Sequence, residues 1–337
     1  MLTTCLLTAC SSMTFLNIET YKPATITFPE QVKKILIVNN AVAQSPDVGY
    51  ELKMYGVVQD TCKAVADSAL YYAVKSLGDA IVEANYFEDV LLYNYPIRTD
   101  DQYLADPKLS QGKVRELCAE TGTDAIISFD RLLFQMYKNV IAYPEGYLSG
   151  GVRVNAAGVL RVYLPTRQGP QTTAMVTDSI SFVEYADDLN HLDQIMLSPD
   201  ESLVVAGRVI GHNSYPLFVP FWKEDLRWYY KGSGTKWQEA SAYAKTQKWD
   251  QAALLWEQIY RASSGKAKAK AASNMALYHE MKGEFQKASD WSVLSYDLFK
   301  TLEGEEGKNA QILELYKQAL SERVTDDTKL NIQIGEY

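Results

Sequence analysis

Two similar segments near the carboxyl end constrain the fold of this chain most strongly. Within residues 236–298 the sequence repeats at an offset of 36 residues, which separates Ala240 from Ala276 and Ala252 from Ala288. Each copy holds two helix-length stretches, and the alanines fall where two helices would cross. Similarity at such a period predicts stacked helical hairpins, because one hairpin alone cannot bury its apolar face.

The period and the small residues resemble the tetratricopeptide repeat, whose length is about 34 residues. Gly283 suits the turn of the second hairpin, and Gln247 takes its place in the first. One more amphipathic helix over residues 310–320 would cap the array, and an ordinary helical bundle is the alternative. The resemblance implies a concave groove formed by the first helices, with Tyr243 and Asn274 as partner-binding residues.

The length and net charge of the chain limit the possible domain organisation and partners. A chain of 337 residues can form two domains with their own cores. The net charge of -9 is spread along the sequence, and the only dense basic run, Lys266, Lys268 and Lys270, is typical of a solvated helix end. We therefore expect no nucleic-acid partner.

The amino-terminal residues Leu7-Thr8-Ala9-Cys10 resemble the lipobox of bacterial lipoproteins. The resemblance implies cleavage before Cys10 and lipid on this cysteine, and therefore a cell-envelope protein anchored to the outer membrane and facing the periplasm. Residues 1–10 would be the signal peptide and lipobox, and residues 11–31 an extended tether or a first edge segment. No Lys or Arg precedes the short apolar run, so a chance match in a cytosolic protein is the alternative.

Two further cysteines leave a question open. Cys62 and Cys118 could pair in an oxidising compartment, but each lies on the apolar stripe of a predicted helix. We favour two buried small hydrophobic residues. No Cys-x-x-Cys motif is present, which argues against thioredoxin-type chemistry.

Residues 32–190 have the pattern of a mixed α/β sheet domain. Short apolar runs alternate with helical stretches in the order β-α-β-α-β, after which longer alternating segments predict an antiparallel meander. The expected strands are residues 32–40, 90–93 and 124–129; the expected helices begin at Asp60 or Thr61 and at Ser110, the second ending at Gly122; and the meander covers residues 132–185.

A helix and an aromatic segment follow over residues 191–235. Ser198-Pro199-Asp200-Glu201 predicts a capped helix start, and this helix should run to about Ile210. Residues 215–230 are rich in aromatics and would cover the open end of the repeats, or else form an exposed binding patch. The repeat region is then residues 236–322 and a tail residues 323–337, so the fold class is α+β with an all-α carboxyl-terminal region.

The order of these features looks like an uncharacterised lipoprotein family of Bacteroidetes. The features that carry the resemblance are the lipobox, residues 122–127, the aromatic residues 228–234 and the repeat pair. The sheet domain alone resembles, in element order, small domains of periplasmic lipoproteins such as activators of cell-wall synthases. These resemblances imply location and architecture, and no activity.

The search for catalytic and metal motifs finds none. The three histidines are far apart, and no nucleophile elbow or complete phosphate loop is present. We therefore expect no cofactor, no metal and no enzymatic activity, and a scaffold that binds an envelope protein or peptide. The alternative is a small-ligand or hydrolytic site in the sheet domain at Asn39, Asn40 and Asp130, where open α/β sheets bind ligands.

Overall fold

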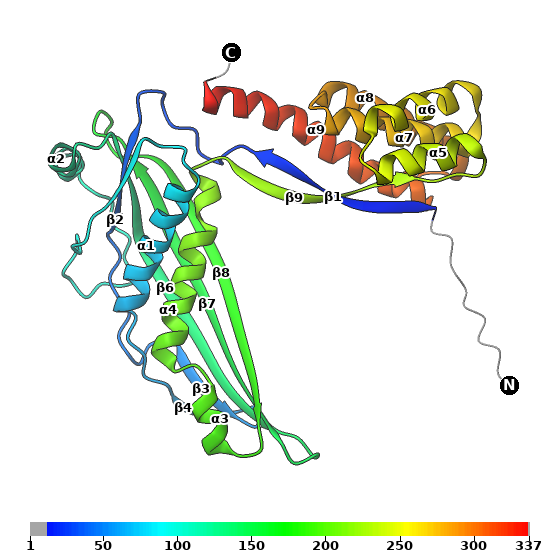
Figure 1. Ribbon diagram of the computed structural model, residues 1–337. Helices are drawn as coiled ribbons and strands as arrows, with labels where there is room; N and C mark the ends of the chain where they lie inside the picture. Colours follow the sequence, from blue (N-terminus) through cyan, green and yellow to red (C-terminus); the bar gives the residue numbers. More distant parts are fainter. Residues whose placement is uncertain (1–11, 336–337) are drawn as a thin grey trace. The chain divides into compact units, whose positions relative to one another are not determined.

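The structure is a computed structural model that describes residues 12–335. The chain divides into two compact units, the sheet unit, Ala24–Pro220, and the helical unit, which joins the residues up to Pro23 with those from Phe221 onward. A strand-rich region is thus followed by a run of helices, as expected for an α+β protein (Figure 1).

The sheet unit contains one seven-stranded sheet built around a long central strand, β6. One edge of β6 pairs first with β2 and then with β3, both in parallel, and its other edge pairs with β7 along its whole length. Strand β5 extends the sheet beyond β2, β4 beyond β3, and β8 beyond β7. The strands are β2 (Lys34–Asn39), β3 (Tyr50–Met54), β4 (Val57–Thr61), β5 (Asp89–Leu92), β6 (Ala125–Ala142), β7 (Leu148–Tyr163) and β8 (Pro170–Ala186).

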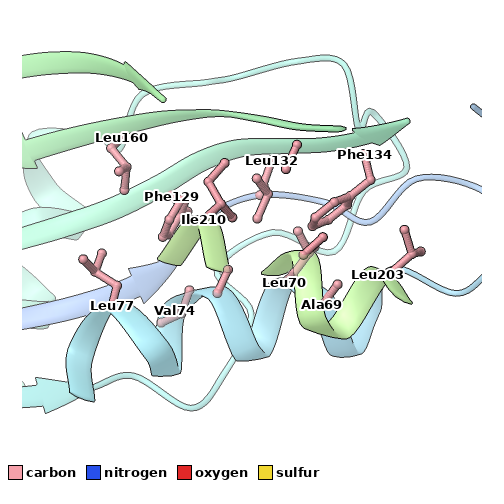
Figure 2. Packing of buried hydrophobic residues seen from close by; sticks show 14 of the residues in the cluster. Ala69, Leu70, Val74, Leu77, Phe129, Leu132, Phe134, Leu160, Leu203 and Ile210 are labelled. Atoms are coloured by element: carbon pink, nitrogen blue, oxygen red, sulfur yellow. The ribbon is translucent and has the colours of Figure 1, made fainter. Parts of the chain in front are cut away.

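Helices cover both faces of this sheet. The alternation along β2 shows it: Ile35 and Ile37 pack in a cluster with α1 and α4, whereas Leu36 and Val38 pack in a cluster with α2. Figure 2 shows the first cluster, with α1 and α4 side by side over β6 and β7. The helices of this unit are α1 (Asp67–Glu83), α2 (Gln111–Thr121), α3 (Leu189–Ile195), α4 (Pro199–Asn213) and the short 3₁₀ helix η1 (Tyr215–Leu217).

Two glycines let α4 lie directly on α1. A Cβ atom on Gly207 would stand 2.3 Å from the carbonyl oxygen of Ala69, and one on Gly211 would stand 2.1 Å from that of Ala73. The spacing of four residues on both helices puts these small residues on facing stripes. Both contacts are to rigid backbone, so the crossing depends on the absence of side chains there.

The helical unit combines a two-stranded ribbon with five helices. Strands β1 (Met13–Lys22) and β9 (Phe221–Tyr230) pair in antiparallel fashion over ten residues each. The helices are α5 (Thr235–Lys245), α6 (Trp249–Ala262), α7 (Gly265–Met281), α8 (Phe285–Glu303) and α9 (Lys308–Ile334). No helix among residues 12–335 is long and apolar enough to span a membrane.

The two hairpins, α5–α6 and α7–α8, repeat one another in detail. Gln247 and Gly283 both have the left-handed backbone, with φ of 58° and 74°. The next amide, that of Lys248 or Glu284, donates to a carbonyl five residues earlier at 2.9 Å in both turns, which is a helix-terminating pattern. The four aligned alanines, at 240, 252, 276 and 288, are fully buried, in agreement with the predicted register.

Several boundaries predicted from the sequence are wrong. Of the two alternatives given for residues 11–31, the structure of residues 12–31 agrees with an edge segment and not with a tether: β1 occupies Met13–Lys22, and Ala24, Ile26 and Phe28 are buried in the sheet unit. The aromatic segment ends in β9, and the predicted tail continues as α9 to Ile334. The two strands pair across some two hundred residues of sequence, and no local pattern signals such a partner.

Other local predictions had mixed outcomes. Asp60 and Thr61 lie in β4, and α1 begins only at Asp67, because an additional hairpin of β3 and β4 precedes it. Ser110 caps α2, which Gly122 ends with a left-handed backbone, as predicted. Ser198 and Glu201 form a complete capping box on α4. Cys62 and Cys118 are both free thiols.

Candidate functional site

A large hollow of the helical unit runs along strand β1. It has a volume of about 810 Å³, and eight consecutive strand residues, Thr14–Tyr21, line it. We call it the β1 groove. Its opposite wall comes from the adjoining ends of α5 and α6, those of α7 and α8, and the second half of α9.

The edge of β1 that faces away from β9 has free backbone groups. Lys231 N donates to Ser12 O at 2.8 Å, and these residues lie opposite one another in the continued register. Alternate residues of an antiparallel strand direct their N–H and C=O groups to opposite edges. The groups of Phe15, Asn17 and Glu19 therefore face away from β9, and among residues 12–335 no other strand pairs with β1.

The helical wall of the β1 groove is largely apolar with balanced charge. Lys245 and Arg323 are its cations, and Glu19 and Asp327 face the same space, whereas Glu280 is buried and paired. The large apolar side chains of this wall are Trp249, Met281, Phe285, Leu330 and Ile334. Such a wall can hold apolar side chains of an extended segment while the strand edge holds its backbone.

Strand β9 is itself held as an extended segment by helix α7. The side-chain amide of Asn274 accepts a hydrogen bond from Tyr230 N at 2.6 Å and donates one to Tyr230 O at 2.8 Å. Asn274 is 0% exposed, so the pair is shielded from water. The amide thus takes the place that a neighbouring strand would take on this edge of β9.

A buried charged network fixes β9 nearby. Arg227 donates to both carboxylate oxygens of Glu280, at 2.8 to 3.1 Å, and Tyr316 O–H donates to the same carboxylate at 2.8 Å. Burial alone would lower the pKa of Arg227, but its bonds to Glu280 outweigh burial and raise it. Burial, followed by the charge of Glu280, raises the pKa of Tyr316. The network joins β9, α7 and α9 at one point.

Asp225 of β9 forms further ionic contacts within the ribbon. Asp225 accepts a hydrogen bond from Thr20 Oγ1 at 3.0 Å, and its carboxylate lies 3.6 Å from Arg227. Partial burial acts to raise the pKa of Asp225, but the Thr20 bond and the charge of Arg227 outweigh it and lower this pKa. The carboxylate thus ties β9 to β1 in its ionised form.

The residues predicted to bind a partner occupy different environments. Tyr243 is 37% exposed and does not line the β1 groove, although its neighbours Ala244 and Lys245 do. Asn274 is bound to the chain's own strand and is not open to another molecule while β9 is in place. Cys10, the predicted lipidation site, lies outside the described residues.

Sequence reasoning did not find the β1 groove. Its strand edge comes from a segment interpreted as a tether or a first edge segment, and part of its far wall comes from a segment predicted to be a tail. The alternation of Leu16, Ile18 and Thr20 with the exposed Phe15 and Asn17 was the available signal for a half-buried strand.

A second hollow lies in the sheet unit, at the carboxyl ends of β2 and β5. These strands are parallel neighbours, and the chain continues from β2 towards α1 on one face and from β5 towards α2 on the other. Such a switch point is where open α/β sheets form a ligand crevice. The crevice has a volume of about 560 Å³ and is lined by Asn39, Tyr71, Tyr93, Tyr95 and Asp101 among others.

Asn40 and Asp130 do not line this crevice and meet each other in a closed network. Asp130 is fully buried and accepts hydrogen bonds from Asn40, Ser128, Arg161 and Tyr163 at 2.6 to 3.0 Å. Both of its oxygens are thereby fully used. Of the three residues proposed for a hydrolytic site, two lie together in this network, whereas Asn39 lines the crevice.

The network also positions the loop before α2. Arg161 donates to the backbone oxygen of Asp106 at 2.9 Å and to its carboxylate at 2.8 Å, and the Tyr163 hydroxyl accepts from Leu109 N at 3.2 Å. Burial and the charge of Asp130 raise the pKa of Tyr163. Asp130 is therefore the centre of a structural cluster that orders this loop, and it has no hydrogen-bonding capacity left for a substrate.

Comparisons with known proteins give two family matches. The model described as domain of unknown function DUF8603 matches residues 32–230, more than half of the chain and as far as the last residue of β9. The model described as domain of unknown function DUF6340 matches residues 238–322, from α5 into α9. No curated protein matches the chain. Among the described residues, no group of three His, Cys, Asp or Glu side chains could hold a metal ion.

Proposed function

This chain belongs to the DUF8603 family, and we propose that it is a non-enzymatic, lipid-anchored scaffold that binds an extended segment of an envelope protein along β1. The observation that carries the proposal is the free edge of β1 beside a groove of about 810 Å³. A strand edge with open donors and acceptors is a template for another strand. The partner is therefore a polypeptide in extended conformation.

The backbone chemistry of the edge supports this class of partner. Phe15, Asn17 and Glu19 offer donors and acceptors at intervals of about 6.8 Å, the spacing of alternate residues in an antiparallel strand. Only an extended backbone supplies complementary groups at this interval over three successive positions. In such strand addition the main chain provides affinity, and side-chain pockets provide selectivity.

The helical hairpins support a role in binding protein segments. Their repeated turns and buried alanines are the features on which we propose a tetratricopeptide-like region of two full units and α9. Such stacks use their concave surface to bind extended or helical segments. In this chain, Asn274 already holds β9 in that way, so the surface is suited to an extended backbone.

The proposed location rests on the amino-terminal motif. Lipid on Cys10 would anchor the protein to the outer membrane, facing the periplasm. Met13, where β1 begins, is three residues further along, so the anchor would hold the β1 groove near the membrane. A Cys10→Ala variant should move from the membrane fraction to the soluble fraction. Equal membrane content of the variant and the wild type would refute the anchor.

The strand-addition proposal can be tested with one backbone change. Asn17→Pro removes an N–H that faces away from β9, so the pairing of β1 with β9 remains. Asn17→Ala is the matched control, since it removes the same side chain and keeps the N–H. Peptides selected from a random library on the full chain should bind the wild type and the Ala variant, and the Pro variant at least about 10-fold more weakly.

Hydrogen exchange provides the second measurement. A bound strand should slow amide exchange at Phe15, Asn17 and Glu19, and leave Leu16 and Ile18, which already pair with β9, unchanged. This alternation is specific to strand addition. Binding without it, or undiminished binding to Asn17→Pro, would refute the proposed site.

The crevice of the sheet unit favours a second candidate function, binding of a small organic cation. Tyr93 and Tyr95 present ring planes inclined at 70° with centroids 5.7 Å apart, and tyrosine faces attract cations. The two cations of the lining, Lys75 and Arg98, are already paired with carboxylates. Asp101 forms no ion pair with the residues described here, so the crevice has excess negative charge.

Choline and its uncharged carbon analogue 3,3-dimethylbutan-1-ol separate this function from general apolar binding. Calorimetric titration should detect choline alone, and Tyr95→Leu should weaken its binding by about 3- to 30-fold. Tyr185→Leu removes another exposed tyrosine of the same unit, away from the crevice, and should leave binding unchanged. Equal binding of both compounds would refute the cation site.

A further inference from the structure

One side chain of the β1 groove is charged, buried and incompletely bonded. Arg323 on α9 is 7% exposed and lines the groove. Its Nη1 donates to Tyr21 O at 2.8 Å, and its guanidinium carbon lies 4.4 Å from the centroid of the Phe285 ring. Its Nε has no hydrogen-bond partner among the described residues.

The other two buried arginines of the described chain are differently placed. Arg161 and Arg227 each donate to buried carboxylates, and their pKa values are raised by these partners in spite of burial. Arg323 forms no ion pair among residues 12–335, and burial lowers its pKa. A buried cation without a counter-charge is costly, and proteins rarely keep one unless something binds it.

The nearby acidic side chains do not supply this counter-charge. Glu280 is bound by Arg227 and Tyr316, and Asp326 by Lys22 at 3.1 Å. Asp225 pairs with Lys223 and Arg227. Asp327, one turn beyond Arg323, also lines the groove and forms no ion pair in the described chain. The variant Asp327→Asn therefore tests whether this carboxylate competes with the partner for Arg323.

We propose that Arg323 binds a carboxylate of the strand that adds to β1, at the end of the groove beside Tyr21. This inference rests on the proposed strand-binding function and adds the chemistry of the partner. The carboxylate is an Asp or Glu side chain or the carboxyl terminus of the segment. A guanidinium forms charge-assisted hydrogen bonds with either kind of carboxylate. The contacts of Arg323 with Tyr21 O and the Phe285 ring already hold its guanidinium in the groove.

The test uses the tightest peptide selected on the full-length protein and its uncharged versions. In one version each Asp and Glu becomes Asn and Gln, and in the other the carboxyl terminus is amidated. The version that loses the bound carboxylate should bind at least about 10-fold more weakly, as expected for a hydrogen bond to a charged group. Which version loses affinity identifies the source of the carboxylate.

Three variants of the protein complete the comparison. In Arg323→Gln the acidic and uncharged peptides should bind alike, whereas Lys245→Gln, which removes the other cation of the groove, should preserve their difference. Asp327→Asn should strengthen the binding of the acidic peptide or leave it unchanged. Should Arg323→Gln fail to fold, the peptide difference on the wild type decides together with Lys245→Gln: a difference preserved in Lys245→Gln supports Arg323, and one that is absent or lost overturns its role.

Failures of the two proposals can be told apart. Uncharged peptides that bind as tightly as acidic ones, and still protect Phe15, Asn17 and Glu19 from exchange, would overturn the role of Arg323 and leave strand addition standing. A difference between peptides that persists in Arg323→Gln, or is lost in Lys245→Gln, would also overturn it. A library that yields no peptide protecting these amides would overturn both proposals.

Discussion

Replacement of Asn274 by Ala should destabilise the helical unit strongly. The change removes two hydrogen bonds, of 2.6 and 2.8 Å, and leaves the N–H and C=O of Tyr230 without partners beside a fully buried side chain. Each buried polar group left unpaired costs about 1–3 kcal/mol, and some relaxation with water entry reduces the total. We expect a loss of about 2–4 kcal/mol of unfolding free energy.

Tryptophan fluorescence isolates this effect. All six tryptophans lie between residues 222 and 291, within the helical unit, so emission during urea unfolding reports this unit and not the sheet unit. With a urea dependence of about 2 kcal/mol per molar, the midpoint should fall by about 1–2 M. Circular dichroism beside it follows both units.

Ser273→Ala is the matched control. Ser273 precedes Asn274 on α7 and is equally buried, but its hydroxyl has no hydrogen-bond partner among the described residues. Loss of an unpaired buried hydroxyl should leave the midpoint unchanged or raise it. An Asn274→Ala midpoint within about 0.3 M of the wild type, or an equal fall in Ser273→Ala, would show that the amide does not hold β9.

Three further predictions concern packing and pH. Gly211→Ala should destabilise the sheet unit by about 1–3 kcal/mol, because its Cβ would stand 2.1 Å from the Ala73 carbonyl oxygen. In the control Gly112→Ala on α2, the nearest atom to the new Cβ is Ser110 Oγ at 4.0 Å, so this change should be neutral or stabilising in thermal melts. Ala288→Leu should cost about 1–3 kcal/mol by tryptophan-detected urea unfolding, since this fully buried alanine lies in a helix–helix core; an unchanged curve would contradict the repeat register. The pKa of Asp225 is lowered in the folded protein, so its stabilisation is present above the unfolded pKa of about 3.9 and is lost as pH falls through the folded value. Asp225→Asn should therefore flatten the decline of the urea midpoint below about pH 5. A decline equal to that of the wild type would show that other groups cause it.

Local signals predicted several helix ends correctly, although not the start of α1. Ser110, Gly122 and the Ser198–Glu201 box mark helix ends because capping is settled by side chains and backbone a few residues apart. The burial of the hairpin alanines could be predicted equally well, because their period reflects contacts between adjacent helices. These features require no knowledge of distant parts of the chain.

The candidate site could not be predicted in the same way. Strand β1 finds its partner β9 about two hundred residues later, and α9 closes the groove from the far end of the chain. Phe15, Asn17 and Glu19 are ordinary residues whose importance arises only from the edge on which their backbone groups lie. Likewise, Asn274 was expected to hold a partner segment, but the segment it holds in the structure is Tyr230 of the same chain.

The occupied surface beside Asn274 bears on how a partner would bind. A segment that displaced β9 would break the Asn274 bonds and leave Glu280 buried without Arg227, and loss of one member of a buried ion pair costs about 3–5 kcal/mol. It would also compete with a tethered strand, present at an effective concentration in the millimolar range or above. A segment that adds to β1 breaks none of these contacts and pairs backbone groups that now face the groove. Addition to β1 is therefore favoured over exchange with β9, and the alternating protection of Phe15, Asn17 and Glu19 with unchanged exchange at Tyr230 distinguishes the two.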